Sequence, residues 1–265
     1  MDRWAGKVAL VTGSSGGIGW DIAKSLVEHG VQVVGLARRL DKLQELAEIL
    51  GRNNFYPVQC DVAKEDNILK AFKWAEEKLG GVDILVNNAA ISIVSMMIDL
   101  STEDYRKVIN INLLAPMIFA REFINAIRKR NASGHILNIS SIAGRYPETF
   151  RDPIGIYCVT KSGLYTLGVE LRHEIMACNL DIRVTTINPG AVKTNMVRDC
   201  LPCIDEFSKE VPILSGKNIA DTVIYALGSP PGAEVFELTI IPQNVVLGTP
   251  VPQLTEYQNR NMINK

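Results

Sequence analysis

Tyr157 and Lys161 stand four residues apart in the chain. On a helix, two residues with this spacing lie on one face, about one turn apart. A phenol with a pKa near ~10 is a poor base at neutral pH, but a neighbouring ammonium favours its ionised form. The pair therefore predicts acid/base chemistry, although the same spacing also occurs on ordinary solvated helix surfaces.

A glycine-rich turn follows the first apolar run of the chain. It reads Thr12, Gly13, Ser14, Ser15, Gly16, Gly17, Ile18 and Gly19, and a helical stretch begins near Trp20. Glycines let the backbone turn tightly, and the N–H groups at the start of a helix attract a pyrophosphate. The spacing differs from the commoner G-x-G-x-x-G pattern, but the order of strand, turn and helix predicts a dinucleotide site.

The residues after the second strand-like run indicate which dinucleotide is bound. A site that selects NAD usually places an acidic side chain there, to bind the ribose 2′-hydroxyl. Here Arg38 and Arg39 follow instead, and no carboxylate appears before Asp41. Arg38 can make charge-assisted bonds to a 2′-phosphate, helped by Ser14 or Ser15, whereas Arg39 is the weaker candidate. The sequence therefore predicts NADP(H).

Short β-rich runs alternate with helical patterns. Strands are expected at Lys7 to Thr12, Gln32 to Ala37, Phe55 to Cys60, Asp83 to Asn87, His135 to Ser140, Asp181 to Ile187 and Val235 to Ile241. Helices are expected near residues 17–29, 41–50, 65–79, 101–129, 155–178 and 217–227. Repeated βα units predict an α/β protein with a doubly wound Rossmann fold: a seven-stranded parallel sheet flanked by helices on both faces.

One domain is expected, because 265 residues can bury one substantial core. Residues 1–241 would form a single NADP-binding Rossmann domain that includes a substrate lid at about 194–214. Residues 242–265 lose all periodicity and are expected to form an extended C-terminal tail.

Composition restricts the partners. A formal net charge of -1 gives no overall attraction to nucleic acid or to an anionic membrane. No signal peptide or membrane-inserting stretch is recognisable, and the five cysteines fit a reduced, cytoplasmic protein that acts on small molecules. Cys200 and Cys203 form one CxxC pair, but no second pair exists, so no metal is expected.

Several motifs in order resemble the short-chain dehydrogenase/reductase family over about residues 6 to 241. They are the glycine turn at 12–19, Asn87-Asn88-Ala89-Ala90, the strand that ends in Ser140 and Ser141, the Tyr157 and Lys161 pair, and the loop Asn188 to Thr194. Two departures stand out. Ala90 replaces the family's usual glycine, and the interval from Ser141 to Tyr157 is about three residues longer than usual, which predicts an enlarged loop within residues 145–156.

The resemblance implies four catalytic residues. By register against the family's Ser-Ser-x-Ala-Gly pattern, Ser141 rather than Ser140 would hydrogen-bond the substrate oxygen, and Tyr157 would pass it a proton. Lys161 would hold the ribose hydroxyls and lower the pKa of the tyrosine. Asn112 resembles the helix asparagine that supports a water relay to that lysine.

The resemblance also implies the cofactor-binding residues. They are Gly13, Ser14, Ser15, Gly17, Ile18, Gly19, Arg38, Arg39, Asp61, Val62, Asn88, Ala89, Tyr157, Lys161, Pro189, Gly190, Val192 and Thr194. Asp61 resembles an acid that contacts the adenine. Val192 would offer its backbone, and Thr194 its hydroxyl, to the nicotinamide carboxamide.

These features predict an NADP(H)-dependent alcohol dehydrogenase or carbonyl reductase for a lipophilic small molecule, a terpenoid such as farnesol or a steroid-like ketone. The apolar residues of the segment 194–214 motivate the substrate class, and residues 1–7 and 34–39 resemble insect farnesol dehydrogenase-like members of the family. The alternative is a catalytically silent NADP-binding regulatory or scaffold protein of the same fold.

The helical stretch 101–129 is apolar on more of its circumference than one sheet contact would bury. Together with the stretch 155–178 and its Gly163 and Gly168, it predicts a homodimer or homotetramer formed through these helices, as is usual in the family. Burial under the chain's own lid or tail is the alternative explanation.

Overall fold

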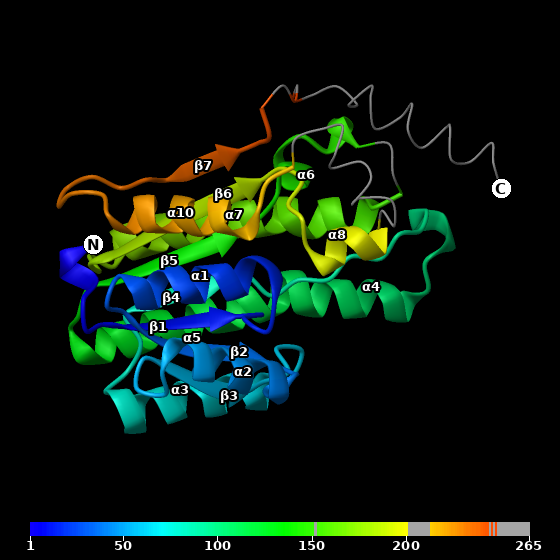
Figure 1. Cartoon of the computed structure of the whole chain (residues 1–265). Coiled ribbons are helices and arrows are strands. Elements are labelled where there is room, and N and C mark those ends of the chain that lie inside the picture. Colours follow the sequence, from blue (N-terminus) through cyan, green and yellow to red (C-terminus); the bar gives the residue numbers. More distant parts are fainter. Residues whose placement is uncertain (151–152, 201–212, 244, 246, 248–265) are drawn as a thin grey trace.

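A single twisted sheet of parallel strands forms the centre of the protein (Figure 1). The computed structural model describes residues 1–150, 153–200, 213–243, 245 and 247. The strand order is β3-β2-β1-β4-β5-β6-β7, and every neighbouring pair is parallel. The strands are β1 (Val8–Thr12), β2 (Gln32–Ala37), β3 (Phe55–Gln59), β4 (Ile84–Asn87), β5 (Gly134–Ile139), β6 (Ile182–Pro189) and β7 (Glu237–Ile240). The predicted fold class is confirmed.

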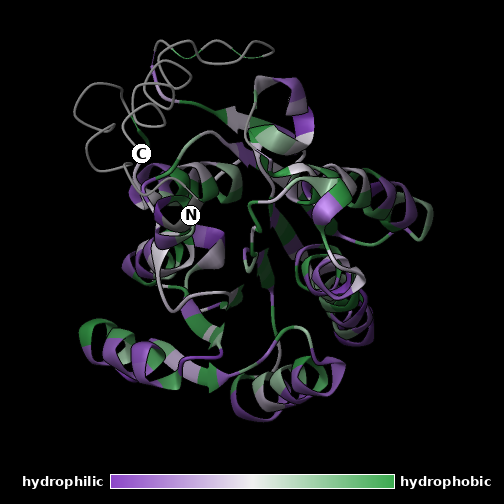
Figure 2. Ribbon diagram, turned by 90° about the vertical axis from the view of Figure 1, so that its right-hand side faces the viewer, coloured by the Kyte–Doolittle hydropathy of each residue, from purple (hydrophilic) through white to green (hydrophobic). Residues whose placement is uncertain are grey.

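Helices cover both faces of the sheet. The longer ones are α1 (Gly17–Glu28), α2 (Leu40–Leu50), α3 (Glu65–Leu79), α4 (Thr102–Ile109), α5 (Ala115–Arg130), α7 (Gly155–Ala177) and α10 (Gly216–Leu227). Short helical segments are α6 (Ile142–Arg145), α8 (Asn195–Cys200) and the 3-10 turns Asp2–Trp4, Met97–Asp99 and Pro147–Thr149. Buried residues of α1, α2 and α10 share one apolar cluster, and those of α3, α5 and α7 share another. Figure 2 shows hydrophobic residues along the strands that lie between these helices.

Two-sided burial explains why the strands are almost continuously apolar. In β2, Val33 packs into the cluster with α1, α2 and α10, while its neighbour Val34 packs into the cluster on the opposite face. Successive side chains of a strand point to opposite faces, so a sheet covered on both sides needs apolar residues at both positions. All five residues of β1 are buried for the same reason.

The strand order reverses between β1 and β4, which opens a crevice at the carboxyl edge of the sheet. Thr12 joins the two strand ends there. Its hydroxyl donates to the carbonyl oxygen of Val86 (3.2 Å) and accepts from the N–H groups of Asn88 and Ala89, both at 2.9 Å. The loops after these two strands are therefore held side by side before any ligand binds.

One predicted helix is three segments in the structure. The stretch 101–129 contains α4, a π-helical turn at Asn110–Leu114, and α5. Ser101 ends the preceding loop and caps α4, because its hydroxyl accepts from the N–H of Asp104 and the Asp104 carboxylate accepts from the N–H of Ser101. The π turn carries Asn112, and its effect on the site is described below.

The apolar surface that predicted self-association is partly used within the chain. Ile111 and Phe119 are buried, whereas Leu114 and Met117 are exposed. A Cβ on Gly168 would lie 2.6 Å from the Thr186 hydroxyl oxygen, so this glycine lets α7 approach the sheet and is no sign of an interface. A Cβ on Gly163 would likewise meet the side chain of Leu113, at 3.0 Å.

Two predicted segments lie largely outside the described residues. Of the expected lid at 194–214, the structure describes α8 and residues 213–214, and residues 201–212 are outside it. Of the expected tail at 242–265, only residues up to 243, with 245 and 247, are described. In the part of the chain that is described, no helix combines the length and apolarity needed to cross a bilayer.

Candidate active site

A cavity of about 330 Å³ lies at the carboxyl edge of the sheet. Most of the residues implicated by sequence line it: Gly13, Ser15, Gly17, Ile18, Arg38, Arg39, Asp61, Val62, Asn88, Ala89, Ser141, Tyr157, Lys161, Pro189, Gly190, Val192 and Thr194. They come from six strand ends and from the first turns of α7. The structure thus brings into one cavity residues that are up to 181 positions apart, from Gly13 to Thr194.

Three implicated residues do not line the cavity. Ser14 is fully buried; its hydroxyl donates to the carbonyl oxygen of Val11 (3.2 Å), and its N–H donates to that of Leu36. Both donors of Ser14 are thus used inside the protein, which favours Ser15 over Ser14 as the serine that helps to hold a phosphate. Gly19 packs beneath the turn, where a Cβ would lie 2.6 Å from the carbonyl oxygen of Gly13. Asn112 is the third.

The glycine turn leaves the start of α1 open to the cavity. Gly16 occupies the N-cap position without a side-chain hydrogen bond, and the first turn of the helix carries no acidic residue. Gly13 and Gly17 adopt positive φ angles of 73° and 58°, a region that other residues rarely enter. Uncapped N–H groups and the positive end of a helix dipole make this a suitable place for a phosphate.

Arg39 reaches over the glycine turn. Its Nη2 donates to the hydroxyl of Ser15 at 3.0 Å and to the carbonyl oxygen of Ser15 at 3.3 Å. Arg38 also lines the cavity, and its carbonyl oxygen accepts from the side-chain amide of Gln59. Arg39, which the sequence indicates as the weaker candidate, thus makes the contact with Ser15. A guanidinium and a hydroxyl at the cavity rim fit an anionic group such as a phosphate.

Lys161 is the most deeply buried charged group of the site. It is 2% exposed, and its Nζ donates to the carbonyl oxygen of Ile139 at 2.7 Å. Burial lowers the pKa of the Lys161 ammonium from 10.5 to about 7. The Nζ lies 5.6 Å from the centre of the Tyr157 ring, as the spacing of one helical turn requires. A phenol therefore stands beside an amine that changes charge near neutral pH.

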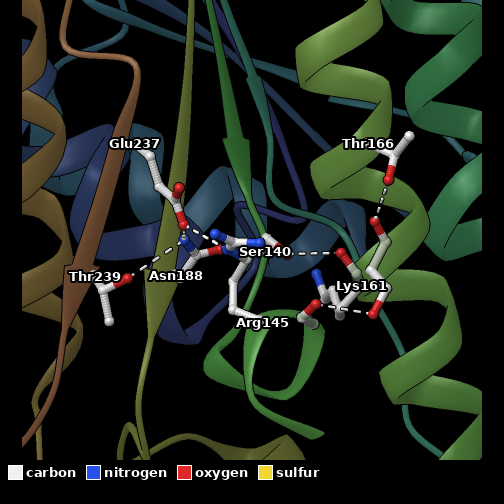
Figure 3. A network of polar contacts seen from close by, with 9 residues as sticks. Ser140, Arg145, Lys161, Thr166, Asn188, Glu237 and Thr239 are labelled. Atoms are coloured by element: carbon white, nitrogen blue, oxygen red, sulfur yellow. Dashed lines mark hydrogen bonds and ion pairs between the residues drawn. The ribbon is translucent and has the colours of Figure 1, made fainter. Parts of the chain in front are cut away.

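The two serines after β5 have different environments. Ser140 donates its hydroxyl to the carbonyl oxygen of Lys161 (2.9 Å), which ties the end of β5 to α7 (Figure 3). Ser141 lines the cavity, and its hydroxyl oxygen accepts from the N–H of Ala143 at 3.1 Å. The hydroxyl proton of Ser141 can therefore still be donated to a ligand. Ser140 also borders the cavity, but its proton is committed to the backbone of α7.

Asn112 acts on the site through the backbone rather than from the cavity wall. Its Oδ1 accepts from the N–H of Ile91 (2.9 Å), and its Nδ2 donates to the carbonyl oxygen of Ile91 (2.8 Å) and to the Thr160 hydroxyl (3.1 Å). The side chain is almost fully buried within the π turn. It thus joins the loop after β4 to the helix that carries Tyr157 and Lys161.

Other residues of the cavity wall were not assigned to the site from the sequence, although Gly16, Ala90 and Ser140 belong to motifs noted there and residues 195–197 to the expected lid. The additional lining residues are Gly16, Ala37, Cys60, Ala90, Ile91, Ile111, Ile139, Ser140, Asn195, Met196 and Val197. Ala37, Cys60 and Ile139 end or directly follow strands, so the rule that parallel strands gather their carboxyl ends at one edge could have found them. Burial raises the pKa of the Cys60 thiol to about 12, so it remains protonated at neutral pH.

No group of three His, Cys, Asp or Glu side chains within the described ranges is placed to share a metal ion. Cys203 of the CxxC pair lies outside those ranges. The cavity brings together the phenol of Tyr157, the amine of Lys161 and the hydroxyl of Ser141, next to a turn suited to a phosphate.

Comparisons with known proteins agree with this geometry. Residues 7–202 match the family described as short chain dehydrogenase. A farnesol dehydrogenase of Aedes aegypti is 36% identical over 246 residues, which cover 91% of this chain and 98% of the relative.

Two solved structures are similar at lower identity. The closed form of serine dehydrogenase complexed with NADP+ has a TM-score of 0.81 and 27% identity, covering 90% of this chain and 96% of its own. A 3-ketoacyl-(acyl-carrier-protein) reductase from Brucella melitensis complexed with NADH has a TM-score of 0.81 and 26% identity, covering 92% of this chain and 100% of its own. Both nicotinamide dinucleotides thus occur among similar structures.

Proposed function

Because this chain belongs to the short-chain dehydrogenase family, we propose that it is an NADP(H)-dependent alcohol dehydrogenase or carbonyl reductase for a lipophilic small molecule. One observation carries the proposal: Ser141, Tyr157 and Lys161 share one cavity with an uncapped helix N-terminus. A proton donor and an anion-binding turn in one cavity suit a reaction between a dinucleotide and a carbonyl group.

The residues of the cavity fit a dinucleotide. A nicotinamide dinucleotide supplies or accepts the hydride when it is bound. The turn from Gly13 to Gly19 would hold the pyrophosphate at the start of α1, and Asp61 and Val62 line the cavity farther along its wall. The contact between Arg39 and Ser15 supports the choice of NADP(H), because a 2′-phosphate would gain both a guanidinium and a hydroxyl.

The chain's own residues would move the proton. In the direction of carbonyl reduction, Ser141 donates a hydrogen bond to the substrate oxygen and Tyr157 transfers its phenolic proton to the same oxygen. The Lys161 ammonium, held by the carbonyl oxygen of Ile139, would then stabilise the phenolate that remains. In the oxidation direction the proton returns from the alcohol to Tyr157.

The lipophilic substrate class rests on the cavity wall. Ile91, Ile111, Met196 and Val197 are apolar residues that line the same cavity as Tyr157. The relative named farnesol dehydrogenase supports a terpenoid alcohol as the first substrate to examine, with steroid-like ketones as the second class.

The test is hydride transfer by purified protein. NADPH oxidation is measured with a panel of apolar aldehydes and ketones, and NADP+ reduction with farnesol, each beside NADH or NAD+. Tyr157→Phe should lower kcat by at least about 100-fold while leaving the Kd for NADPH within about threefold. Tyr225→Phe is the matched control, because Tyr225 is an exposed residue of α10 and does not line the cavity.

Two results would contradict the proposal. Unchanged turnover in Tyr157→Phe would remove the proposed proton donor. Saturable NADPH binding without transfer to any carbonyl would favour the alternative, a silent NADP-binding regulatory or scaffold protein.

We also propose that the chain forms a homodimer or homotetramer through α4, α5 and α7. The support is a set of exposed apolar side chains on these helices and on the π turn between α4 and α5: Ile109, Leu114, Met117 and Val159. Sedimentation equilibrium tests this directly. Replacing Leu114 and Met117 by Asp should shift the protein towards the monomer, and a monomeric wild-type protein at micromolar concentration would contradict the proposal.

A further inference from the structure

Glu237 does not line the cavity, but one of its carboxylate oxygens accepts hydrogen bonds from two segments that contribute residues to the cavity wall. The Nε of Arg145 donates to Oε1 of Glu237 at 2.8 Å, and the Nδ2 of Asn188 donates to the same oxygen at 2.7 Å (Figure 3). Arg145 is the last residue of α6, the single turn that begins after Ser141. Asn188 lies in β6 directly before Pro189 and the cavity residue Gly190.

Arg145 also contacts the helix of the proposed proton donor. Its guanidinium carbon lies 4.0 Å above the centre of the Tyr165 ring. Tyr165 is four residues after Lys161, one turn farther along α7. A planar guanidinium can stack on a ring and donate to a carboxylate together. Arg145 therefore touches the edge strand β7 and the helix α7 at once.

The turn that carries Ser141 also packs closely against α7 through Gly144. A Cβ on Gly144 would lie 2.5 Å from the carbonyl carbon of Lys161, and the Ser162 hydroxyl donates to the carbonyl oxygen of Gly144 at 2.8 Å. α6 has only four residues, and a helix of one turn is not stable alone. Its position relative to Tyr157 must come from these outside contacts.

A second ion pair of the same kind lies farther from the cavity. The Nε of Arg172, in α7, donates to Oε2 of Glu234 at 2.7 Å, and Oε1 of Glu234 accepts from the N–H of Val184 at 2.9 Å. The two pairs are closely matched in side-chain exposure: 33% and 23% for Arg145 and Glu237, 34% and 22% for Arg172 and Glu234. Neither Arg172 nor Val184 lines the cavity.

We propose that Glu237, acting through Arg145 and Asn188, is a positioning residue that fixes the Ser141 turn and the end of β6 relative to the phenol of Tyr157. This inference rests on the proposed function for its effect on turnover. Loss of the carboxylate removes two restraints together: the ion pair of Arg145, which ties the turn to β7, and the 2.7 Å hydrogen bond from Asn188, whose Nδ2 keeps only a long contact of 3.5 Å with the Thr239 hydroxyl. A displaced hydroxyl lowers the rate of proton transfer more than it lowers the affinity for the cofactor.

The experiment compares Glu237→Leu with Glu234→Leu in the full chain. Both variants should lose a similar amount of thermal stability, because the two pairs are alike. Glu237→Leu should lower kcat by about 10- to 100-fold, and Glu234→Leu by less than about threefold, with the Kd for NADPH almost unchanged in both. Glu237→Gln keeps an acceptor oxygen and should recover a large part of kcat.

A double variant tests whether the pair acts as a unit. Arg145→Met with Glu237→Leu should lower kcat no further than the worse of the two single variants. Equal losses of kcat in Glu237→Leu and Glu234→Leu, or additive losses in the double variant, would overturn the positioning role. If Glu237→Leu does not fold, kcat is compared in milder variants. Glu237→Gln and Arg145→Lys should then each lower kcat more than their controls, Glu234→Gln and Arg172→Lys.

A second readout needs no turnover. The N–H of Ala143, which donates to the Ser141 hydroxyl, should exchange with solvent deuterium faster in Glu237→Leu than in Glu234→Leu. Unchanged exchange of the residues 141–145 in Glu237→Leu would overturn the inference even in an active enzyme. Absence of turnover in the wild-type protein, with faster exchange in Glu237→Leu, would contradict the proposed function alone.

Discussion

The glycine turn after β1 and the serine turn after β5 both contain two adjacent serines, and the two pairs divide their tasks in the same way. Ser14 and Ser140 direct their hydroxyls to backbone carbonyl oxygens inside the protein. Ser15 and Ser141 follow them and line the cavity. In each turn the first serine fixes the loop to its surroundings, and the second is presented to a ligand.

The turns differ in how the following helix begins. The glycine turn leaves the N-terminus of α1 without a side-chain cap, whereas the Ser141 hydroxyl caps α6 by accepting from the N–H of Ala143. An uncapped helix start can bind an anion, and a capped one holds a hydroxyl in a fixed place. We therefore propose that the glycine turn binds an anion and that the serine turn presents a hydrogen-bond donor to the substrate, although both turns contain a pair of serines.

The largest effect is expected from Ser141→Ala. Loss of a hydrogen-bond donor to the substrate oxygen should lower kcat by about 100-fold or more, with NADPH binding retained. Steady-state kinetics and a fluorescence titration of NADPH measure both quantities. Ser140→Ala is the control: it should reduce the free energy of unfolding by about 1 kcal/mol and affect kcat far less. Equal losses of kcat in Ser141→Ala and Ser140→Ala would show that the first and the second serine do not differ in role.

The next effect concerns how tightly each turn is packed. Gly144→Ala would place a Cβ 2.6 Å from the carbonyl oxygen of Lys161, which is backbone and has no free space to move into. The free energy of unfolding should fall by about 1–3 kcal/mol. Gly16→Ala meets only the Nη2 of Arg39, at 3.6 Å, and should lose less than about 1 kcal/mol. Urea denaturation without ligand distinguishes them, and a larger loss in Gly16→Ala would contradict the packing argument.

A smaller effect tests the anion site in the glycine turn. Arg39→Ala removes the guanidinium that contacts Ser15 and should weaken NADPH binding by about tenfold at low salt, with little change for NADH. Arg38→Ala should weaken NADPH binding less. Calorimetric titrations with both dinucleotides measure the difference. A greater loss of NADPH affinity in Arg38→Ala than in Arg39→Ala would show that Arg38 is the main contact of the 2′-phosphate, as the sequence alone indicates.

The smallest effect is a pH dependence that comes from Lys161, the residue of α7 whose carbonyl oxygen binds the serine turn. The folded-state pKa of Lys161 is about 7, below its usual 10.5, so between these values the unfolded chain binds a proton that the folded chain has released. Stability without ligand should therefore rise with pH in this window, by about 1 kcal/mol from pH 7 to 8 from this group. Melting curves should show a shallower rise in Lys161→Met. An identical pH profile in both proteins would contradict the lowered pKa.

Much of the fold follows from local pattern. Continuous apolar runs such as β1 predict strands buried on both faces, and the seven expected strands are found with ends shifted by at most two residues, as at Val235 to Ile241 against Glu237–Ile240. The turns after these strands predict where the cavity lies, because parallel strands end at a common edge. The motifs at Gly13 and Tyr157 predict two of its walls.

Directions of side chains and long-range pairs could not be predicted. Ser14 and Ser15 have the same chemistry, and only the turn's backbone decides which hydroxyl is buried. Arg145 and Glu237 are 92 positions apart, and no periodicity marks either residue as a partner of the other. The resemblance implied Asn112, but its contacts with Ile91 and Thr160 depend on a π turn, which a pattern based on 3.6 residues per turn does not reveal.

The π turn at Asn110–Leu114 holds one residue more than a regular α-helical turn, because its bonds join residue i to residue i+5. Each residue added to an α-helix rotates everything beyond it by about 100° around the axis. The π turn absorbs one such addition, so the apolar residues of α5, with Phe119 and Phe123, still face the sheet that buries them. The extra residue thus brings Asn112 into contact with Ile91 and Thr160 without changing how α5 packs.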